Sequence, residues 1–96
     1  MSYEVRRAEE NSKGSFTAWD GEARAGEMTY SRGNPTLVIV DHTDVFPGYE
    51  GKGVGKQLVA AAVAWAREEG QKIMPLCPFA RATFERTGEY ADVWFR

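Results

Sequence analysis

Four glycines fall within eight residues of the stretch FPGYEGKGVGKQLV, and three of them alternate with Lys52 and Val54. Glycine lacks the Cβ atom that would hold an anion away from backbone N–H groups, and a nearby lysine adds positive charge. An apolar, alanine-rich segment follows directly, so these N–H groups would stand at the start of a helix. The pattern predicts a phosphate-binding loop at Gly51, Gly53 and Gly55. The alternative interpretation is a tight strand-to-helix turn without a ligand.

The spacing of these glycines separates the loop from two well-known phosphate motifs. The order is G-x-G-x-G, with no lysine and serine or threonine after a four-residue spacer, as a P-loop requires. It also differs from the G-x-G-x-x-G fingerprint of dinucleotide-binding domains. The loop is therefore neither a P-loop nor a dinucleotide fingerprint.

Cys77 and His42 are the residues that could act as nucleophile or base, being the only cysteine and histidine of the chain. A thiol becomes a nucleophile when a neighbouring base or a helix N-terminus favours its thiolate. The structural alternatives are a buried thiol and a strand histidine bonded to the backbone or to Asp44. So few soft ligands also predict the absence of a zinc site.

The elements that would position these residues begin with an antiparallel meander. Three runs with strand character span Tyr3–Glu9, Gly14–Gly21 and Glu22–Arg32. The Asp20–Gly21 pair is a strong signal for a tight turn between strands. We therefore expect three successive antiparallel strands.

The next strand is predicted over Thr36–Phe46. Its first half is a continuous β-branched run, which predicts a central strand covered on both faces. If the strand is regular, His42 and Asp44 share a face with Val38 and Val40. A β-bulge would break this parity.

A helix should follow the glycine loop and end at Gly70. Its apolar positions recur at helical spacing: Val54, Leu58, Ala61, Ala62 and Trp65. A further strand is predicted over Lys72–Phe79, a short helix over Ala80–Gly88, and an aromatic tail that packs back on the body. A strand–helix–strand unit of this length predicts a right-handed crossover between parallel strands. The fold class expected is α+β, a mixed and mostly antiparallel sheet with one parallel crossover and a short C-terminal helix.

Composition sets the remaining expectations. The 96 residues predict a single domain, 1–96, and 43% hydrophobic with 27% charged residues is typical of soluble globular proteins. The net charge of −2 argues against a general nucleic-acid binder. No apolar run approaches the roughly 20 residues of a membrane span, and the N-terminus carries no signal-peptide pattern. With a single cysteine, a reducing, cytoplasmic location is expected.

The blocks HTDVFPGYEGKGVGKQL and PLCPF, in this order and at this spacing, resemble a family of very short GNAT-like N-acetyltransferases. The similarity runs from Phe16 to near the end of the chain. It implies a cosubstrate, acetyl-CoA, whose pyrophosphate lies on the loop and whose pantetheine arm follows the opening strand, with no metal. The cofactor-binding residues that it implies are Val45, Phe46, Glu50, Gly51, Lys52, Gly53, Val54, Gly55, Lys56 and Phe79. It also implies Cys77 and His42 as catalytic residues: Cys77 accepts the acetyl group with His42 as base, or Cys77 lines the site while an amine attacks directly.

Two departures accompany this resemblance. Glu50 stands where the superfamily has arginine or glutamine, which places negative charge near a bound pyrophosphate, and Phe46 is an added residue before Pro47. The resemblance implies transfer of acetyl to an unidentified amine, either a small molecule or a protein lysine. The rival interpretations are an acyl-CoA-binding or sensing module without catalysis and a protein-interaction domain that keeps the fold alone. The sequence gives no prediction of oligomeric state.

Overall fold

The computed structural model describes residues 3–96. Its strands are β1 (Glu4–Glu10), β2 (Lys13–Asp20), β3 (Ala23–Asn34), β4 (Leu37–Val45) and β5 (Lys72–Pro75). The helices are α1 (Val54–Glu69), α2 (Pro78–Arg86) and the 3₁₀ helix η1 (Gly88–Val93). None of the helices within residues 3–96 has the length and apolar character that crossing a bilayer needs.

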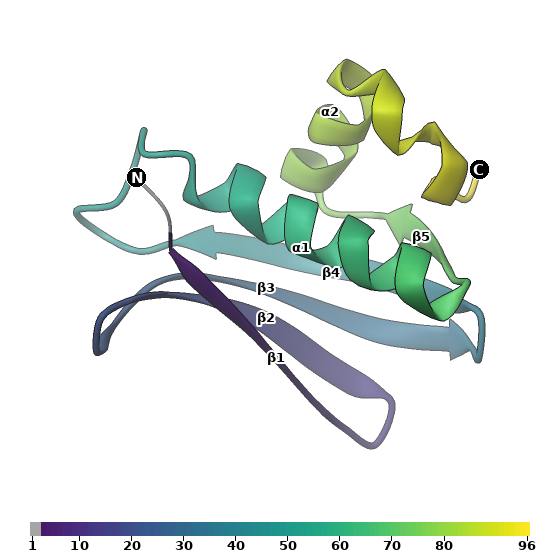
Figure 1. Ribbon diagram of the computed structural model, residues 1–96, viewed down its shortest axis with the longest axis horizontal. Coiled ribbons are helices and arrows are strands. Elements are labelled where there is room, and N and C mark those ends of the chain that lie inside the picture. The colour runs from purple at the N-terminus through teal and green to yellow at the C-terminus, as the bar shows by residue number, and fades with distance from the viewer. Residues whose placement is uncertain (1–2) are drawn as a thin grey trace.

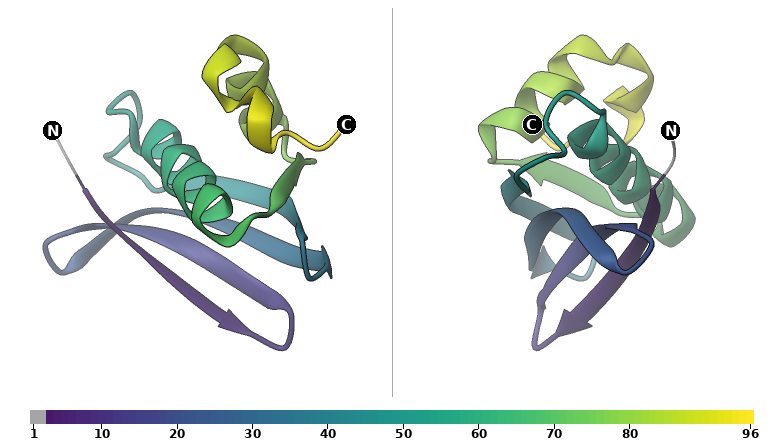
Figure 2. Two further views of the ribbon diagram at one scale, coloured as in Figure 1. Left: turned by 45° about the vertical axis from the view of Figure 1, so that its right-hand side comes forward. Right: turned by 90° about the vertical axis from the view of Figure 1, so that its left-hand side faces the viewer.

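The strands form one sheet in the order β1-β2-β3-β4-β5, antiparallel except for the parallel pair β4 and β5. Helix α1 makes the crossover between these two strands, and all helices lie on the same face of the sheet (Figures 1 and 2). The α+β class, the antiparallel meander and the parallel crossover predicted from the sequence are confirmed. The turn at Gly21 adopts φ +63°, a conformation that glycine reaches without steric cost.

The expectation that β4 is covered on both faces is wrong. Val38 and Val40 are buried beneath the helices, whereas Leu37 and Ile39 on the opposite face are partly exposed. The domain has two layers, so the face of the sheet away from α1 is open along β4 (Figure 2). The continuous β-branched run marked the strand as internal in the sheet, but not as covered on both faces.

A β-bulge at Asp41 also overturns the predicted parity of β4. Val40 pairs with Tyr30 of β3, and His42 pairs with the next residue, Thr29, so Asp41 is an extra residue on β4. Beyond the bulge, Thr43 takes the helix-facing position because it pairs with the buried Met28. His42 is turned to the open face.

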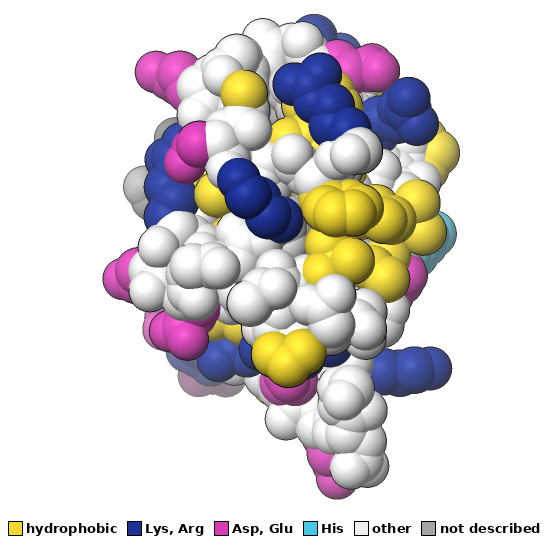
Figure 3. Space-filling model, turned by 90° about the vertical axis from the view of Figure 1, so that its right-hand side faces the viewer, with side chains coloured by type: hydrophobic (Ala, Val, Ile, Leu, Met, Phe, Trp, Pro, Cys, Tyr) yellow, Lys and Arg dark blue, Asp and Glu magenta, His cyan; other side chains and the backbone are white. Residues whose placement is uncertain are grey.

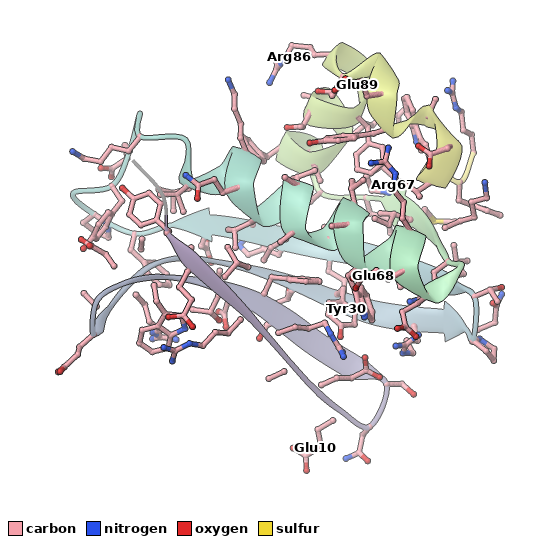
Figure 4. All side chains as sticks on the ribbon, viewed as in Figure 1. Glu10, Tyr30, Arg67, Glu68, Arg86 and Glu89 are labelled. Carbon is pink, nitrogen blue, oxygen red and sulfur yellow. The ribbon has the colours of Figure 1, made fainter. Side chains whose placement is uncertain are left out.

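The core lies between the sheet and α1. The fully buried positions of α1 are Val54, Leu58, Val59, Ala62, Val63 and Ala66, which recur at helical spacing. They pack on the sheet residues Phe16, Met28, Tyr30, Val38 and Val40. Tyr30 lies beneath the second half of α1 (Figure 4), where its ring contacts Trp65 with 5.3 Å between centroids. As predicted, Gly70 ends α1, with φ +66° and an N–H bond to Ala66.

The segment after α1 differs in its boundaries from the prediction. β5 ends at Pro75 rather than Phe79, and α2 begins at Pro78, because proline at the first helical position loses no hydrogen bond. Between them, the N–H groups of Leu76 and Cys77 both donate to the Val40 carbonyl. The aromatic tail packs back as expected: the Phe95 N–H bonds to Ile73, and the Trp94 ring lies 5.7 Å from that of Phe84.

A polar cluster ties β1 to β3 and α1 at the end of the core. The Arg32 guanidinium donates to Glu9 at 2.8 Å, and the Tyr30 hydroxyl donates to the same carboxylate at 2.7 Å. Arg32 and Arg7 also lie over the Trp65 ring, at 5.2 and 4.4 Å from its centroid. The bonds from Arg32 and then Tyr30 lower the pKa of Glu9 below its usual 4.5.

Because the pKa of Glu9 is lower in the folded chain, its ion pair stabilises the fold above about pH 4.5 and this contribution is lost as pH falls through the folded pKa. We expect Glu9→Gln to reduce stability at pH 7 and to flatten the loss of stability between pH 7 and pH 3. Urea unfolding across this range measures both quantities. Arg32→Gln removes the largest cause of the shift, so an unchanged pH dependence in both variants would contradict the prediction.

Candidate functional site

The site begins where β4 and β5 separate. The two strands pair from Leu37–Lys72 to Val40–Pro75, after which β4 continues to Val45 while the chain after β5 turns into α2. The bulge at Asp41 lies at this point of separation. An opening lined by Val45 of β4 and Phe79 of α2 lies beyond this point. The loop before α1 follows the end of β4 (Figure 1).

The backbone along the last part of β4 faces this opening. The Phe46 N–H donates to the Ala25 carbonyl at 2.9 Å, so Phe46 is bonded to β3. Because hydrogen-bonding groups alternate in direction along an antiparallel strand, the N–H and C=O of Val45 point away from β3. A linear ligand with amide groups could bond to Val45 there as an added strand. The Phe46 ring lies beside Arg24, with 5.4 Å between the ring centroid and the Arg24 Cζ atom.

The glycine loop ends in a helix start that has no cap of its own. Gly48, Gly51 and Gly53 have φ values of +93°, +74° and +80°, and an added Cβ would meet no atom within 4 Å at any of them. Gly53 is the N-cap of α1 without a side-chain cap bond, and no acidic residue stands in the first turn. The first N–H groups of the helix therefore point outward with the positive end of the helix dipole.

A cavity of about 380 Å³ lies at this helix start and reaches the end of β4. It is lined by Val45, Tyr49, Glu50, Gly51, Gly53, Val54, Gly55, Lys56 and Phe79. All of these except Tyr49 are cofactor-binding residues expected from the sequence, and two further expected residues, Phe46 and Lys52, do not line the cavity. The cavity, the open space above the glycines and the N–H groups at the helix start could together accept an anionic group attached to a linear chain.

The structure separates the roles of the three alternating glycines. Gly51 and Gly53 need their positive φ and leave open space above the loop. Gly55 is instead buried inside the first turn of α1, where a Cβ would lie 2.5 Å from Cζ of Phe79. Gly55 therefore allows Phe79 of α2 to approach α1 and form one wall of the cavity.

Glu50 is bonded within the loop, and Tyr49 is bonded to the end of β2. The Glu50 carboxylate accepts a bond from the Gly48 N–H at 3.0 Å, although its residue still lines the cavity. Sequence reasoning missed Tyr49, whose aromatic type within the loop was the available signal. Its hydroxyl donates to Asp20 at 2.8 Å, which raises the pKa of Tyr49, and its ring packs edge-on against Tyr3 at 6.0 Å.

The structure does not bring the two predicted catalytic residues together. His42 lies on the open face of the sheet with a side chain that is 67% exposed, hydrogen-bonded to Asp44 at 3.1 Å. Cys77, at the N-cap of α2, is 4% exposed, and its thiol donates to the Thr43 hydroxyl at 3.2 Å. The bulge is the physical reason, because it puts Thr43 rather than His42 on the face that meets Cys77. Sequence reasoning missed Thr43.

A second hollow, of about 420 Å³, lies beside β5 and the C-terminal residues, and none of the predicted site residues lines it. Leu76 and Phe95, both largely exposed, lie in it together with Arg81, Glu85 and Arg96. Figure 3 shows hydrophobic side chains gathered on this side of the molecule, next to lysine and arginine side chains. Within residues 3–96, no three histidine, cysteine, aspartate or glutamate side chains converge as a metal site would require.

Comparison with solved structures identifies proteins of similar fold. A GCN5-like N-acetyltransferase candidate from Staphylococcus aureus, solved by NMR, is 35% identical with a TM-score of 0.75, over 98% of this chain and 89% of its own. An acetyltransferase from Bacillus subtilis, solved in complex with CoA, is 31% identical with a TM-score of 0.59, over 67% of this chain and 43% of its own.

A ribosomal-protein-alanine N-acetyltransferase from Brucella melitensis shares the fold, at 21% identity and a TM-score of 0.69, over 80% of this chain and 62% of its own. The chain thus spans less than two thirds of the Brucella and Bacillus proteins. A search of curated proteins gave no significant match. The model of the GCN5-related N-acetyltransferase family matches residues 15–93. The chain therefore belongs to the GCN5-related N-acetyltransferase family.

Proposed function

We propose that this chain binds acetyl-CoA in the cavity at the start of α1 and transfers the acetyl group to an amine. The observation that carries the proposal is the uncapped, glycine-rich helix start, which opens into a cavity bordered by the end of β4, where β4 no longer pairs with β5. The Bacillus subtilis relative was solved with CoA, and a related acetyltransferase from Bacillus anthracis, 24% identical, with acetyl-CoA. A cytoplasmic location, expected from the single cysteine, is part of this proposal.

Different residues of the site would bind different parts of the ligand. The pyrophosphate would accept bonds from the N–H groups of Gly53, Val54 and Gly55, because these groups have no helical partner and glycine lets an anion approach them. Lys56 lines the cavity and would add positive charge, as would Lys52 nearby. The pantetheine arm would run along Val45, which places the thioester deeper in the opening, towards Cys77.

Transfer would proceed by direct attack of a neutral amine on the thioester carbonyl. The buried thiol of Cys77, bonded to Thr43 and separated from His42, supports this route over an acyl-cysteine intermediate with His42 as base. The acceptor, a small amine or a protein lysine, is not identified by these observations. The absence of a base beside Cys77 among the described hydrogen bonds also supports a second candidate, an acyl-CoA-binding module without catalysis. Binding without turnover would distinguish it.

The test is a titration of the isotopically labelled protein with acetyl-CoA, followed through its backbone amides by NMR. We expect saturable shifts at Gly51, Gly53, Gly55 and Lys56, with smaller ones at Val45 and Cys77. Release of the CoA thiol in the presence of a panel of amines then separates an enzyme from a binding module. Amides that do not shift at millimolar acetyl-CoA would leave the loop as a turn and contradict the proposal.

Glu50→Gln is expected to tighten acetyl-CoA binding by about threefold. The substitution removes a negative charge beside the cavity and keeps an oxygen that can accept the Gly48 bond. The gain should shrink as salt rises, because the charge is exposed to solvent. Isothermal titration at two salt concentrations measures it, with Glu10→Gln at the far hairpin end as the matched control (Figure 4). Equal affinity for Glu50→Gln and wild type would show that the charge at position 50 does not act on the ligand.

A further inference from the structure

Thr43 occupies the position beside Cys77 because of the bulge in β4. In a regular strand its side chain would face the open side of the sheet, as the sequence pattern predicted for the residues alternating with Val38 and Val40. The extra residue at Asp41 reverses this, so that Thr43 pairs with the buried Met28 and faces the helices. Because of the bulge, the side chain of Thr43 rather than that of His42 faces the helices where β4 and β5 separate.

Thr43 and Cys77 contact each other next to residues that line the cavity, although neither lines it itself. Val45 lies two residues beyond Thr43 on the same face of β4, and Phe79 lies two residues beyond Cys77; both line the cavity. The thiol donates its S–H to the Thr43 hydroxyl at 3.2 Å, and the Cys77 N–H is held by the Val40 carbonyl at 3.1 Å. Backbone and side chain of Cys77 are therefore both fixed, at the depth where the thioester of a ligand lying along Val45 would end.

We propose that Thr43 is a positioning residue that holds the Cys77 thiol as the proton donor for the departing CoA thiolate, an inference that rests on the proposed function. The amine nitrogen forms a bond to the acetyl carbon, and the carbon–sulfur bond breaks with its electron pair going to the CoA sulfur. Cys77 gives its S–H proton to that sulfur, and the surplus proton of the amine goes to water. Cys77 then regains a proton from water.

A hydroxyl suits both states of the thiol. The Thr43 oxygen accepts the S–H bond before transfer, and the same hydroxyl can donate its own hydrogen to the thiolate that transfer leaves behind. Donation to a charged sulfur is the stronger of these bonds, so its benefit appears in the proton-transfer step. Valine at position 43 would keep the branched shape of threonine and remove both bonds.

The first test compares Thr43→Val and Thr43→Ser in steady-state acetyl transfer. We expect Thr43→Val to lower kcat by about tenfold with the KM for acetyl-CoA changed less than about twofold, and Thr43→Ser to restore most of kcat. In the Cys77→Ala background, Thr43→Val should cause no further loss, because it acts through the thiol. An equal loss in both backgrounds, or an unchanged kcat in Thr43→Val, overturns the proposal.

Two further measurements do not require turnover. Alkylation of Cys77 by iodoacetamide, without acetyl-CoA, should be several-fold slower in Thr43→Val than in wild type and recover in Thr43→Ser, since alkylation proceeds through the thiolate. Equal rates would overturn the positioning role even if no acceptor amine is found, and failure of the proposed function alone would leave the alkylation result standing. Mass measurement after incubation with acetyl-CoA alone should show no acetyl group on Cys77; a cysteine adduct would make the thiol a nucleophile and overturn the proton-donor role.

Discussion

Gly53→Ala is expected to weaken acetyl-CoA binding by at least about tenfold, which is about 1.4 kcal/mol. Gly53 is the N-cap of α1 at φ +80° and lines the cavity. A Cβ there meets no protein atom within 4 Å, so it would occupy the space above the loop in which the phosphates are proposed to lie. Alanine also strains the left-handed backbone by about 1–2 kcal/mol, which would shift the loop away from its binding conformation.

Gly21→Ala is the matched control for this strain. Gly21 has φ +63°, also has open space around its Cβ direction, and lies in the β2–β3 turn rather than in the cavity lining. Both variants should therefore lose about 1 kcal/mol of stability in urea unfolding. Only Gly53→Ala should lose acetyl-CoA affinity, measured by isothermal titration. Equal affinity in the two variants would contradict a ligand on the loop, because it would leave Gly53 with a conformational role alone.

Leu58→Ala is expected to lower the free energy of unfolding by about 3–4 kcal/mol. Leu58 has no exposed surface and packs from α1 towards Gly26 of β3, which has no side chain of its own to fill the space. Removing its side chain leaves a cavity between the two layers, and a chain of this size has about 5–15 kcal/mol of stability in total. Leu58→Ala should therefore bring the domain close to unfolding at physiological temperature.

Leu76→Ala makes the same chemical change at an exposed site. Leu76, the residue after β5, is 61% exposed, so its replacement should alter the free energy of unfolding by less than about 0.5 kcal/mol. Urea unfolding of both variants, with the slope of the transition compared, separates loss of core packing from a change in the unfolded chain. A large effect at Leu76 would indicate that the hollow beside β5 contributes packing that its exposure does not suggest.

The sequence predicted the order of elements because the relevant signals are local. Alternation in the first strands, the turn at Gly21, the helical spacing after Gly53 and the stop at Gly70 each depend on neighbouring residues. The glycine loop was recognised for the same reason. All the residues expected around the ligand line one cavity except Phe46 and Lys52.

What could not be predicted depends on register between strands. The bulge at Asp41 has no sequence signal of its own, and it decides that Thr43 rather than His42 meets Cys77. The sequence likewise did not indicate that one face of β4 is open, since β-branched residues suit half-buried and fully buried strands alike. The catalytic pairing inferred from residue types therefore did not follow from strand order alone.

The two ends of α1 are completed in different ways. At its C-terminus the Gly70 N–H closes the helix on Ala66, whereas at its N-terminus the N-cap residue Gly53 makes no side-chain cap bond. An anion bound there would supply the missing cap. Ligand binding would therefore stabilise the folded form of the first turn of α1. Cosubstrate concentration would then set how often the first turn of α1 opens, and with it the stability of the helix that links β4 to β5.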